Sequence, residues 1–189
     1  MSQYKKLNLG CGDKLMKEYI NVDKFETFNP DLIHDLEMFP YPFEDETINE
    51  IQMIHVLEHI GQQPDVFINI MKELYRICVN EAEIHIRVPH PRHDDYLSDP
   101  THVRPITTLT LALFDLEENK RWQASGAANS RMAMIHSVNF KIMKIDVKID
   151  KKYQKQFNSG EISIGDIEEY ASKYNNVIKE TYYLLKVIK

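Results

Sequence analysis

The sequence is poor in the features that cross-link small secreted domains or hold proteins in membranes. Only Cys11 and Cys78 supply thiols among 189 residues, which excludes a disulfide framework and favours a reducing compartment. No segment approaches the run of about 18 apolar residues that a membrane helix needs, and the N-terminal MSQYKKLNLG lacks the apolar stretch of a secretory signal. We therefore expect a cytoplasmic protein without a membrane partner.

Positive charge is also scarce. Lysine and arginine number 23 against 29 aspartates and glutamates, for a net charge of −6. Residues 1–140 carry a net charge of −9, and residues 141–189, where lysines are interleaved with acidic residues, carry +3. Nucleic-acid-binding domains concentrate basic residues on one surface, so this balance argues against nucleic acid as a partner. It indicates nothing about the oligomeric state.

The composition is that of a globular domain, with 43% hydrophobic and 28% charged residues, and a chain of this length can bury one sizeable core. Short apolar runs alternate with loops or helices over the first 90 residues, which is typical of an α/β domain. The patterns predict strands at residues 6–9, 19–23, 32–36, 48–54 and 82–88, and a helix at residues 65–79.

The second half differs in character. Residues 90–105 form a polar segment with three histidines, residues 107–119 have a helical pattern, and residues 123–130 are small and polar, which predicts a mobile stretch. Further along, the patterns predict a strand at 140–149, a short helix at 166–174 and a final strand at 177–188. We see no internal repeat and no domain boundary.

The first predicted strand ends in Gly10-Cys11-Gly12. A glycine turn lets the backbone approach a ligand closely, and parallel sheets bind ligands beyond the carboxyl ends of their strands. Asp23 ends the second predicted strand and Asp35 lies at the end of the third. A carboxylate there could accept hydrogen bonds from a ribose diol or an exocyclic amine, so the three strand ends together describe a nucleoside pocket.

With these motifs the chain resembles the class I S-adenosylmethionine-dependent methyltransferases. The matching segments are LNLGCG at 7–12, NVD at 21–23, DL at 35–36, PFED at 42–45, HVLEHI at 55–60 and IRVP at 86–89. The resemblance implies a Rossmann-like α/β sheet of about seven strands, the last one antiparallel. Parallel crossovers usually need about a dozen residues or more, so the short connections after Gly10 and Lys24 predict reduced early helices.

On this resemblance we expect one methyltransferase-like domain over residues 1–189. Residues 5–90 would bind the cofactor, residues 90–136 would form a substrate or lid insertion, and residues 137–189 would supply the closing strands. The glycine turn would wrap the methionyl part, Asp23 would bind the ribose, Asp35 the adenine amine, and His55 would lie near the sulfonium. The residues assigned to the cofactor are Asn8, Gly10, Cys11, Gly12, Asp23, Lys24, Asp35, Leu36 and His55.

The expected reaction is O- or N-methylation of a small-molecule acceptor, whose identity the sequence does not reveal. A hydroxyl acceptor would need a base with a pKa near the working pH, for which histidine is suited. The candidate bases flank the expected methyl-bearing end of the pocket and are His59, His90, His93 and His102. Arg92 and Arg104 could clamp a carboxylate or phosphate of the acceptor.

Other interpretations remain open. The chain could be a non-catalytic S-adenosylmethionine-binding regulatory or assembly protein, since Asn8 stands where many relatives of this family have an acidic residue. His55-x-x-Glu58-His59 spells an inverted zinc-hydrolase motif, although no long helix can be built there. A dinucleotide-binding oxidoreductase is not favoured, because Leu15 stands where the G-x-G-x-x-G fingerprint needs its third glycine after Gly10 and Gly12. No metal site is assigned, but a second group of side chains could either hold a metal or line a polar loop: His90, His93, Asp94, Asp95 and His102.

Overall fold

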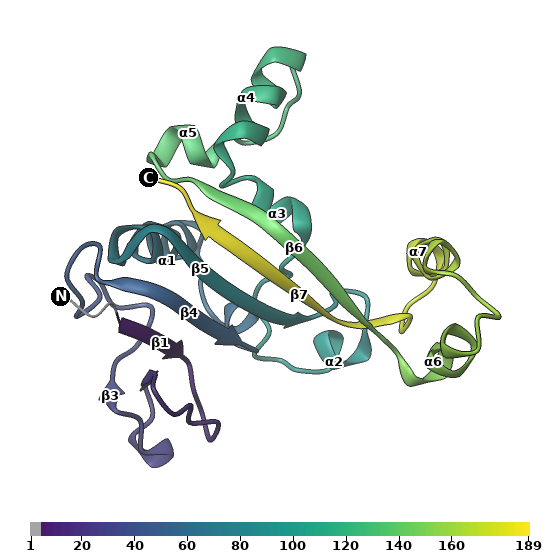
Figure 1. Cartoon of the computed structure of the whole chain (residues 1–189), viewed down its shortest axis with the longest axis horizontal. Helices are drawn as coiled ribbons and strands as arrows, with labels where there is room; N and C mark the ends of the chain where they lie inside the picture. The colour runs from purple at the N-terminus through teal and green to yellow at the C-terminus, as the bar shows by residue number, and fades with distance from the viewer. Residues whose placement is uncertain (1–4) are drawn as a thin grey trace.

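The computed structural model describes residues 5–189, which form one mixed sheet with the strand order β3-β2-β1-β4-β5-β7-β6 (Figure 1). The strands are β1 (Lys5–Leu9), β2 (Ile20–Asp23), β3 (Leu32–Ile33), β4 (Ile48–Ile54), β5 (Cys78–Pro89), β6 (Phe140–Ile149) and β7 (Ile178–Val187). The five strands β1 to β5 pair in parallel, and β7 is antiparallel to both β5 and β6. The predicted seven-stranded α/β sheet with an antiparallel last strand is confirmed.

The core lies on one face of this sheet. Ile51 of β4 pairs with Leu7 of β1 on one side and with Ile84 of β5 on the other, and all three side chains are fully buried. Helix α1 (Pro64–Ile77) packs against this face with Phe67, Ile70, Met71, Leu74 and Ile77 buried. Its apolar residues recur at helical spacing and its proline stands in the first turn, where no backbone donor is lost.

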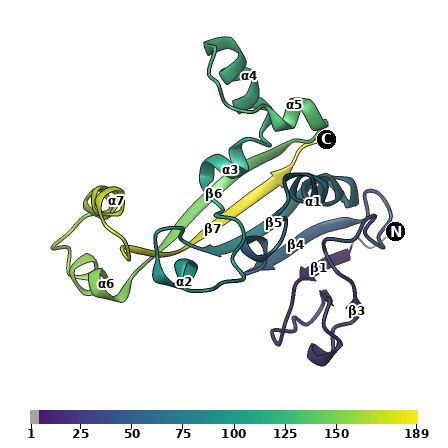
Figure 2. The same ribbon diagram turned by 180° about the vertical axis from the view of Figure 1, so that it is seen from behind.

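No helix of residues 5–189 covers the opposite face of the central strands, which faces the viewer in Figure 1, whereas α1 stands in front of the sheet in Figure 2. Residues 10–19 form turns and coil between β1 and β2, and only the single 3₁₀ turn η1 (Glu26–Phe28) separates β2 from β3. The early helices are therefore reduced, as the short connections predict. The described part of the domain therefore has two layers here, the sheet and α1, and lacks the third layer that helices on the other face would form.

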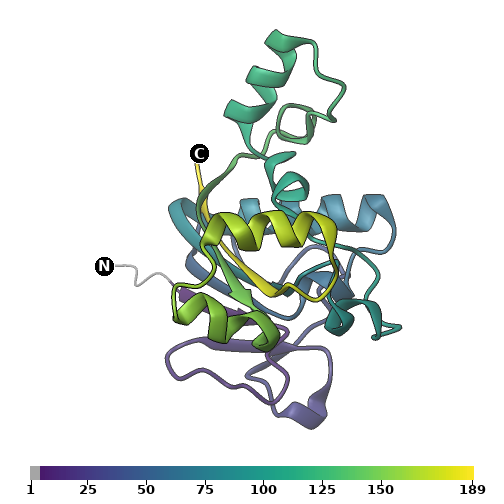
Figure 3. The same cartoon turned by 90° about the vertical axis from the view of Figure 1, so that its right-hand side faces the viewer.

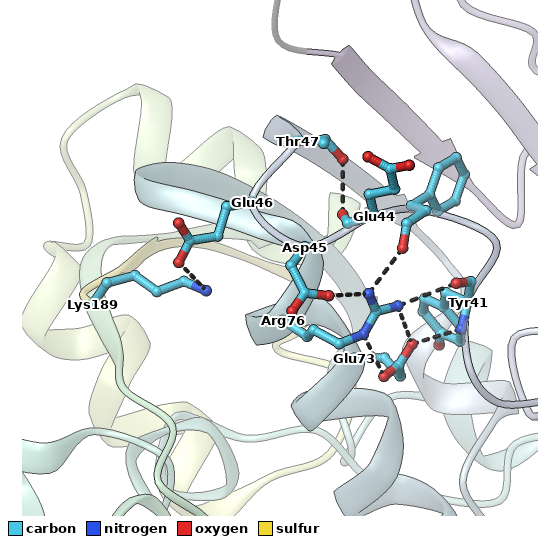
Figure 4. Close-up of polar contacts among 9 residues, drawn as sticks. Tyr41, Glu44, Asp45, Glu46, Thr47, Glu73, Arg76 and Lys189 are labelled. Carbon is cyan, nitrogen blue, oxygen red and sulfur yellow. Dashed lines mark hydrogen bonds and ion pairs between the residues drawn. The ribbon is translucent and has the colours of Figure 1, made fainter.

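The helix-free connection from β3 to β4 is fastened by Arg76 of α1 (Figure 4). Its guanidinium donates to Glu73 at 2.7 Å, to Asp45 at 2.6 Å, and to the carbonyl oxygens of Phe43 and Tyr41 at 2.9 and 3.1 Å. Burial alone would raise the pKa of Glu73, but the hydrogen bonds from Arg76 and the Tyr41 N–H outweigh it and lower that pKa. One charged side chain thus replaces the packing that a helix would provide.

The second half of the chain adds short helices. They are η2 (Leu57–His59), α2 (Asp94–Leu97), α3 (Thr108–Ala112), α4 (Leu116–Ser125), α5 (Met132–His136), α6 (Lys151–Asn158) and α7 (Ile164–Lys173). Helices α6 and α7 form a hairpin beyond the ends of β6 and β7, facing the viewer in Figure 3, with a small apolar cluster of their own around Ile167. The described helices include none long and apolar enough to cross a membrane.

Several predicted boundaries are wrong. The third strand stops at Ile33 instead of residue 36, and β5 starts at Cys78 instead of residue 82. The helical pattern at 107–119 is divided between α3 and α4, because Asp115 caps a new helix by accepting from the N–H groups of Glu117 and Glu118. Helix α6 was not predicted.

The two extensions of the fold lie at opposite edges of the sheet. Helix α5 leads into Phe140, which pairs with Val187 at the end of β7, so residues 116–136 project from the edge where the parallel strands begin (Figure 1). Residues 123–130 of the predicted substrate or lid insertion therefore lie away from the carboxyl ends of the parallel strands, and a lid role for them stays a prediction. The hairpin α6–α7 projects from the other edge, where Glu180 pairs with Pro89 at the end of β5.

Candidate functional site

The turn after β1 lies at the carboxyl edge of the parallel strands. Gly10 and Gly12 both have left-handed backbones, with φ of +64° and +50°. A Cβ on Gly10 would lie 2.6 Å from Val56 Cγ2, whereas a Cβ on Gly12 would have no atom within 4 Å. Gly10 is thus required for packing against the segment after β4. Gly12 borders open space, as a ligand-facing position must.

Asp23, at the end of β2, faces this turn. Its Oδ2 accepts a hydrogen bond from the Gly12 N–H at 2.9 Å and its Oδ1 accepts one from the Phe25 N–H at 3.0 Å. The side chain is 8% exposed. Carboxylate oxygens can each accept a further bond, so Asp23 both fixes the turn and keeps acceptor capacity at its rim.

Asn8 supports the turn from below. Its side-chain amide donates to the Lys14 carbonyl and to Asn21 Oδ1, both at 2.9 Å. Asn21 in turn donates to Asp31 from its backbone and side chain, and these hydrogen bonds lower the pKa of the Asp31 carboxyl. Asn8 is 3% exposed, so its side chain supports the glycine turn from within the protein, and its assignment to the cofactor stays a prediction.

The other residues predicted to bind the cofactor differ in exposure. Cys11 is buried, and burial followed by the charge of Asp23 raises its pKa. Lys24 is exposed with its Nζ 5.2 Å from the centroid of the Phe25 ring. Asp35 Oδ1 accepts from the Glu37 N–H, and Leu36 belongs to the main core. Large apolar side chains stand exposed in this part of the chain: Leu15, Phe25 and Met38 on the connections, and Ile33 at the end of β3.

The HVLEHI segment turns sharply at the end of β4. His55 has a left-handed backbone with φ of +58°, and the following 3₁₀ turn η2 comprises only Leu57–His59. His55 and His59 therefore do not share the face of a long helix, which the zinc-hydrolase interpretation requires. Between them, Glu58 is 1% exposed, and neither of its carboxylate oxygens has a hydrogen-bond partner.

His102 lies beside this turn because the backbone of residues 103 and 104 donates to the Glu58 carbonyl oxygen, at 2.8 and 3.2 Å. The His59 and His102 rings are 4.6 Å apart between centroids. His59 Nδ1 lies 2.9 Å from Thr101 Oγ1, and His102 Nδ1 lies 2.8 Å from the Tyr96 carbonyl oxygen. The structure thus brings together two of the four predicted histidines. It adds Glu58, which sequence reasoning used only in the zinc motif.

His90 lines a cavity of about 410 Å³ between the end of β5, the start of α3 and strands β6 and β7, within the size range of small-molecule pockets. Burial, followed by the charges of Arg92 and His93, lowers the pKa of His90. Its ring is therefore neutral near pH 7, and its Nδ1 already accepts a hydrogen bond from the Arg92 N–H at 3.3 Å. The cavity lies on the β7 side of β5, away from the glycine turn.

Three further predicted residues are already engaged within the protein. Both nitrogens of His93 have partners, since Nδ1 accepts from the Asp95 N–H and Nε2 lies 3.2 Å from Asp150 Oδ2. Arg92 donates to carbonyl oxygens at the end of α7, and Arg104 donates to the Gly61 carbonyl while stacking on Phe67. The predicted roles of the two arginines as acceptor clamps stay predictions, and each would first have to leave these contacts.

The strand order and the antiparallel β7 define the fold of the class I S-adenosylmethionine-dependent methyltransferases. A methyltransferase of this kind from Archaeoglobus fulgidus superposes with a TM-score of 0.67 at 18% identity, covering 97% of this chain and 86% of that one. One from Methanosarcina mazei has a TM-score of 0.57 at 12% identity, covering 100% and 94%. No family model matches the sequence, and no curated protein is significantly similar to it.

The same fold also carries other chemistry. The [4+2]-cyclase SpnF superposes with a TM-score of 0.54 at 13% identity, covering 98% of this chain and 75% of that one. At such identities the likeness establishes the fold, and the activity has to be argued from the site.

Proposed function

We propose that the protein binds S-adenosylmethionine at the glycine turn and transfers its methyl group to a small-molecule acceptor. The observation that carries the proposal is Gly12, whose left-handed backbone borders open space while its N–H is held by Asp23 at the end of the adjacent strand. Beside this turn stand exposed apolar side chains such as Phe25, which is 53% exposed and suited to cover a purine ring. The acceptor capacity of Asp23, the open space beside Gly12 and the apolar surface together fit this cofactor.

The chain's contribution to the reaction would be positioning. S-adenosylmethionine supplies an electrophilic methyl group, which bonds to the acceptor's lone pair while the methyl–sulfur electron pair returns to sulfur and the acceptor's proton passes to a base or to water. The turn of Gly10 to Gly12 and Asp23 would fix one reactant, and η2 with residues 90–107 would fix the other. Holding two reactants in line lowers the barrier by up to roughly 7–11 kcal/mol.

Among the predicted bases, His59 follows the segment that packs against the glycine turn, and His102 lies beside His59. Val56, which contacts Gly10, precedes His59 by three residues. We propose that the acceptor's reactive group lies against this pair. The non-catalytic alternative is separated by product: formation of S-adenosylhomocysteine with an acceptor pool supports an enzyme.

The sharpest test of cofactor binding is Gly12→Ala. The new Cβ would project into the open space, so the affinity for S-adenosylmethionine or S-adenosylhomocysteine, measured by calorimetry, is expected to fall by at least tenfold. A non-glycine residue in the left-handed region also costs about 1–2 kcal/mol of stability. Ligand binding stabilises the wild type against heat, and this thermal shift should be smaller in the variant at the same ligand concentration.

Gly160→Ala is the matched control. Gly160 has φ of +76° with no atom within 4 Å of its Cβ position, but it lies in the α6–α7 turn. It carries the same backbone strain at a distance from the site, so its cofactor affinity should equal that of the wild type. Equal affinity in all three proteins would refute the placement of the cofactor.

A further inference from the structure

Glu58, His59 and His102 form a cluster that the methyl-transfer fold does not require. One candidate ligand atom from each residue lies within 4.8 Å of the other two. Ligands bound to one ion at about 2.0–2.2 Å lie within about 4.4 Å of each other, a limit only slightly shorter than the 4.8 Å within which these three atoms lie. Glu58 comes from the turn after β4 and His102 from the loop after β5, so two separate connections converge here.

The carboxylate of Glu58 is the unusual member. It is 1% exposed, and neither oxygen has a hydrogen-bond partner. The His55 ring nitrogen Nδ1 lies 3.4 Å from Oε1 and compensates the carboxylate only when that ring is protonated. A buried carboxylate without hydrogen bonds is costly to keep, and a cation bound between the three side chains would compensate it.

The hydrogen bonds of the two histidines leave a specific nitrogen free on each ring. The Tyr96 carbonyl can only accept, so His102 Nδ1 must carry the proton and donate. Thr101 Oγ1 donates its proton to Asp99, so it accepts from His59 Nδ1. In the neutral form, Nε2 of both rings therefore carries a lone pair. Metal-ligating histidines commonly donate a hydrogen bond from their other ring nitrogen to a backbone carbonyl or a carboxylate. His102 donates to the Tyr96 carbonyl, and His59 donates to Thr101, which is itself bonded to Asp99.

From this arrangement we propose that Glu58, His59 and His102 bind a divalent first-row transition-metal ion such as Zn²⁺, Fe²⁺ or Mn²⁺. Two imidazoles and one carboxylate suit these ions and leave coordination positions open. The three residues differ from the histidine–aspartate group of the polar loop that the sequence suggested, of which only His102 takes part.

The site lies beside the cofactor turn, because Val56 packs against Gly10 and precedes Glu58 by two residues. Resting on the proposed function, we infer that an oxygen atom of the acceptor occupies an open position on the metal. Coordination lowers the pKa of a bound hydroxyl and orients it. His59 and His102 would then act as ligands, and the acceptor's proton would leave to water.

The test begins with protein stripped of metal by a chelator. Titration with Co²⁺, followed by visible absorption, and with Zn²⁺, followed by calorimetry, should show one site per chain in the wild type. Glu58→Gln and His102→Ala should each weaken binding by tenfold or more. His136→Ala, which removes a histidine outside the cluster, should bind as the wild type does.

Two further measurements keep the outcomes distinct. Without metal, Glu58→Gln should melt at the same temperature as the wild type or higher, because it removes an unpartnered buried charge; a marked fall would assign Glu58 to the fold and overturn the proposal. S-adenosylhomocysteine affinity should be unchanged in all variants. Metal binding without cofactor binding would refute the proposed function alone, whereas cofactor binding without saturable metal binding would refute the metal site alone.

Discussion

At the scale of single residues, His93 and His102 differ in what their rings already hold. The sequence places both among the candidate bases. In the structure both nitrogens of His93 are engaged, joining the start of α2 to Asp150 at the start of α6. His102 has one nitrogen fixed by a backbone carbonyl and the other 3.8 Å from Asp99, too long for a hydrogen bond. Of these two histidines, only His102 keeps a lone pair for a reactant or a metal.

This difference gives a paired prediction. His93→Ala should lower the free energy of unfolding by about 1–3 kcal/mol, because buried partners lose their hydrogen bonds, and should leave cofactor affinity unchanged. His102→Ala should also lose some stability, because its side chain is equally buried and bonds the Tyr96 carbonyl, but it should in addition lower turnover by about tenfold or more. Urea unfolding and S-adenosylhomocysteine formation measure the two effects. Normal stability with lost turnover in His93→Ala would instead support its role as a base.

The sequence shows which residue types end each strand, but it does not show which of their polar atoms are buried or already hydrogen-bonded within the protein. Gly12 and Asp23 were found because a strand followed by glycine, or ending in aspartate, is visible in one dimension. The burial of Glu58 depends on residues 103 and 104, which approach it from 45 positions away. No local pattern contains that contact.

At the scale of elements, the connection from β3 to β4 depends on Arg76. Arg76→Ala would leave the half-buried Glu73 without its charged partner, which should lower the free energy of unfolding by about 1–3 kcal/mol. The Tyr41 N–H alone would remain to bind Glu73. Lys72→Ala, on the same helix but outside this group, should change stability little. Equal losses in both variants would show that the guanidinium contacts contribute nothing specific.

The ion pair of Glu73 and Arg76 makes the free energy of unfolding depend on pH. The pKa of Glu73 is lowered on folding, so its contribution to stability is full above its unfolded pKa near 4.5 and is lost as the pH falls through its folded pKa. Wild-type unfolding free energy should therefore drop more steeply below about pH 4.5 than that of Arg76→Ala. Parallel slopes would contradict this assignment.

Elements with strict periodicity were predicted well. Strands β4 and β6 match the predicted residues 48–54 and 140–149, since alternating side chains define them. Helix α6 was missed because its polar residues hide a short apolar pair, Tyr153 and Phe157, four positions apart. Its Asp150 cap, which accepts from the Lys152 N–H, was the available signal.

At the scale of the whole molecule, the two extensions serve different edges. The sequence places residues 90–136 after β5, but it does not show that this segment runs from the carboxyl ends of the parallel strands back to their amino ends. That course is set by two long-range contacts, the packing of α3 on β6 and the pairing of Phe140 with Val187. The hairpin α6–α7 was predicted only in part, yet it stands on the ligand side. Of the expected insertion, residues 103 and 104 contact the turn after β4, and the assignment of residues 90–136 to substrate binding stays a prediction.

The sheet face that no described helix covers bears on whether copies of the protein associate in solution. Strands of a parallel sheet are usually apolar on both sides, but here Glu50, Gln52, His85 and Tyr182 form a polar row joined by hydrogen bonds and close charges. Replacing Gln52 and His85 together with valine should leave the circular dichroism spectrum unchanged, since neither belongs to the core. It should create an adhesive apolar patch and cause concentration-dependent self-association by light scattering, unlike the exposed-helix control Lys152→Val. A doubly substituted protein that stayed monodisperse would show that this polar row is not what keeps the molecules apart.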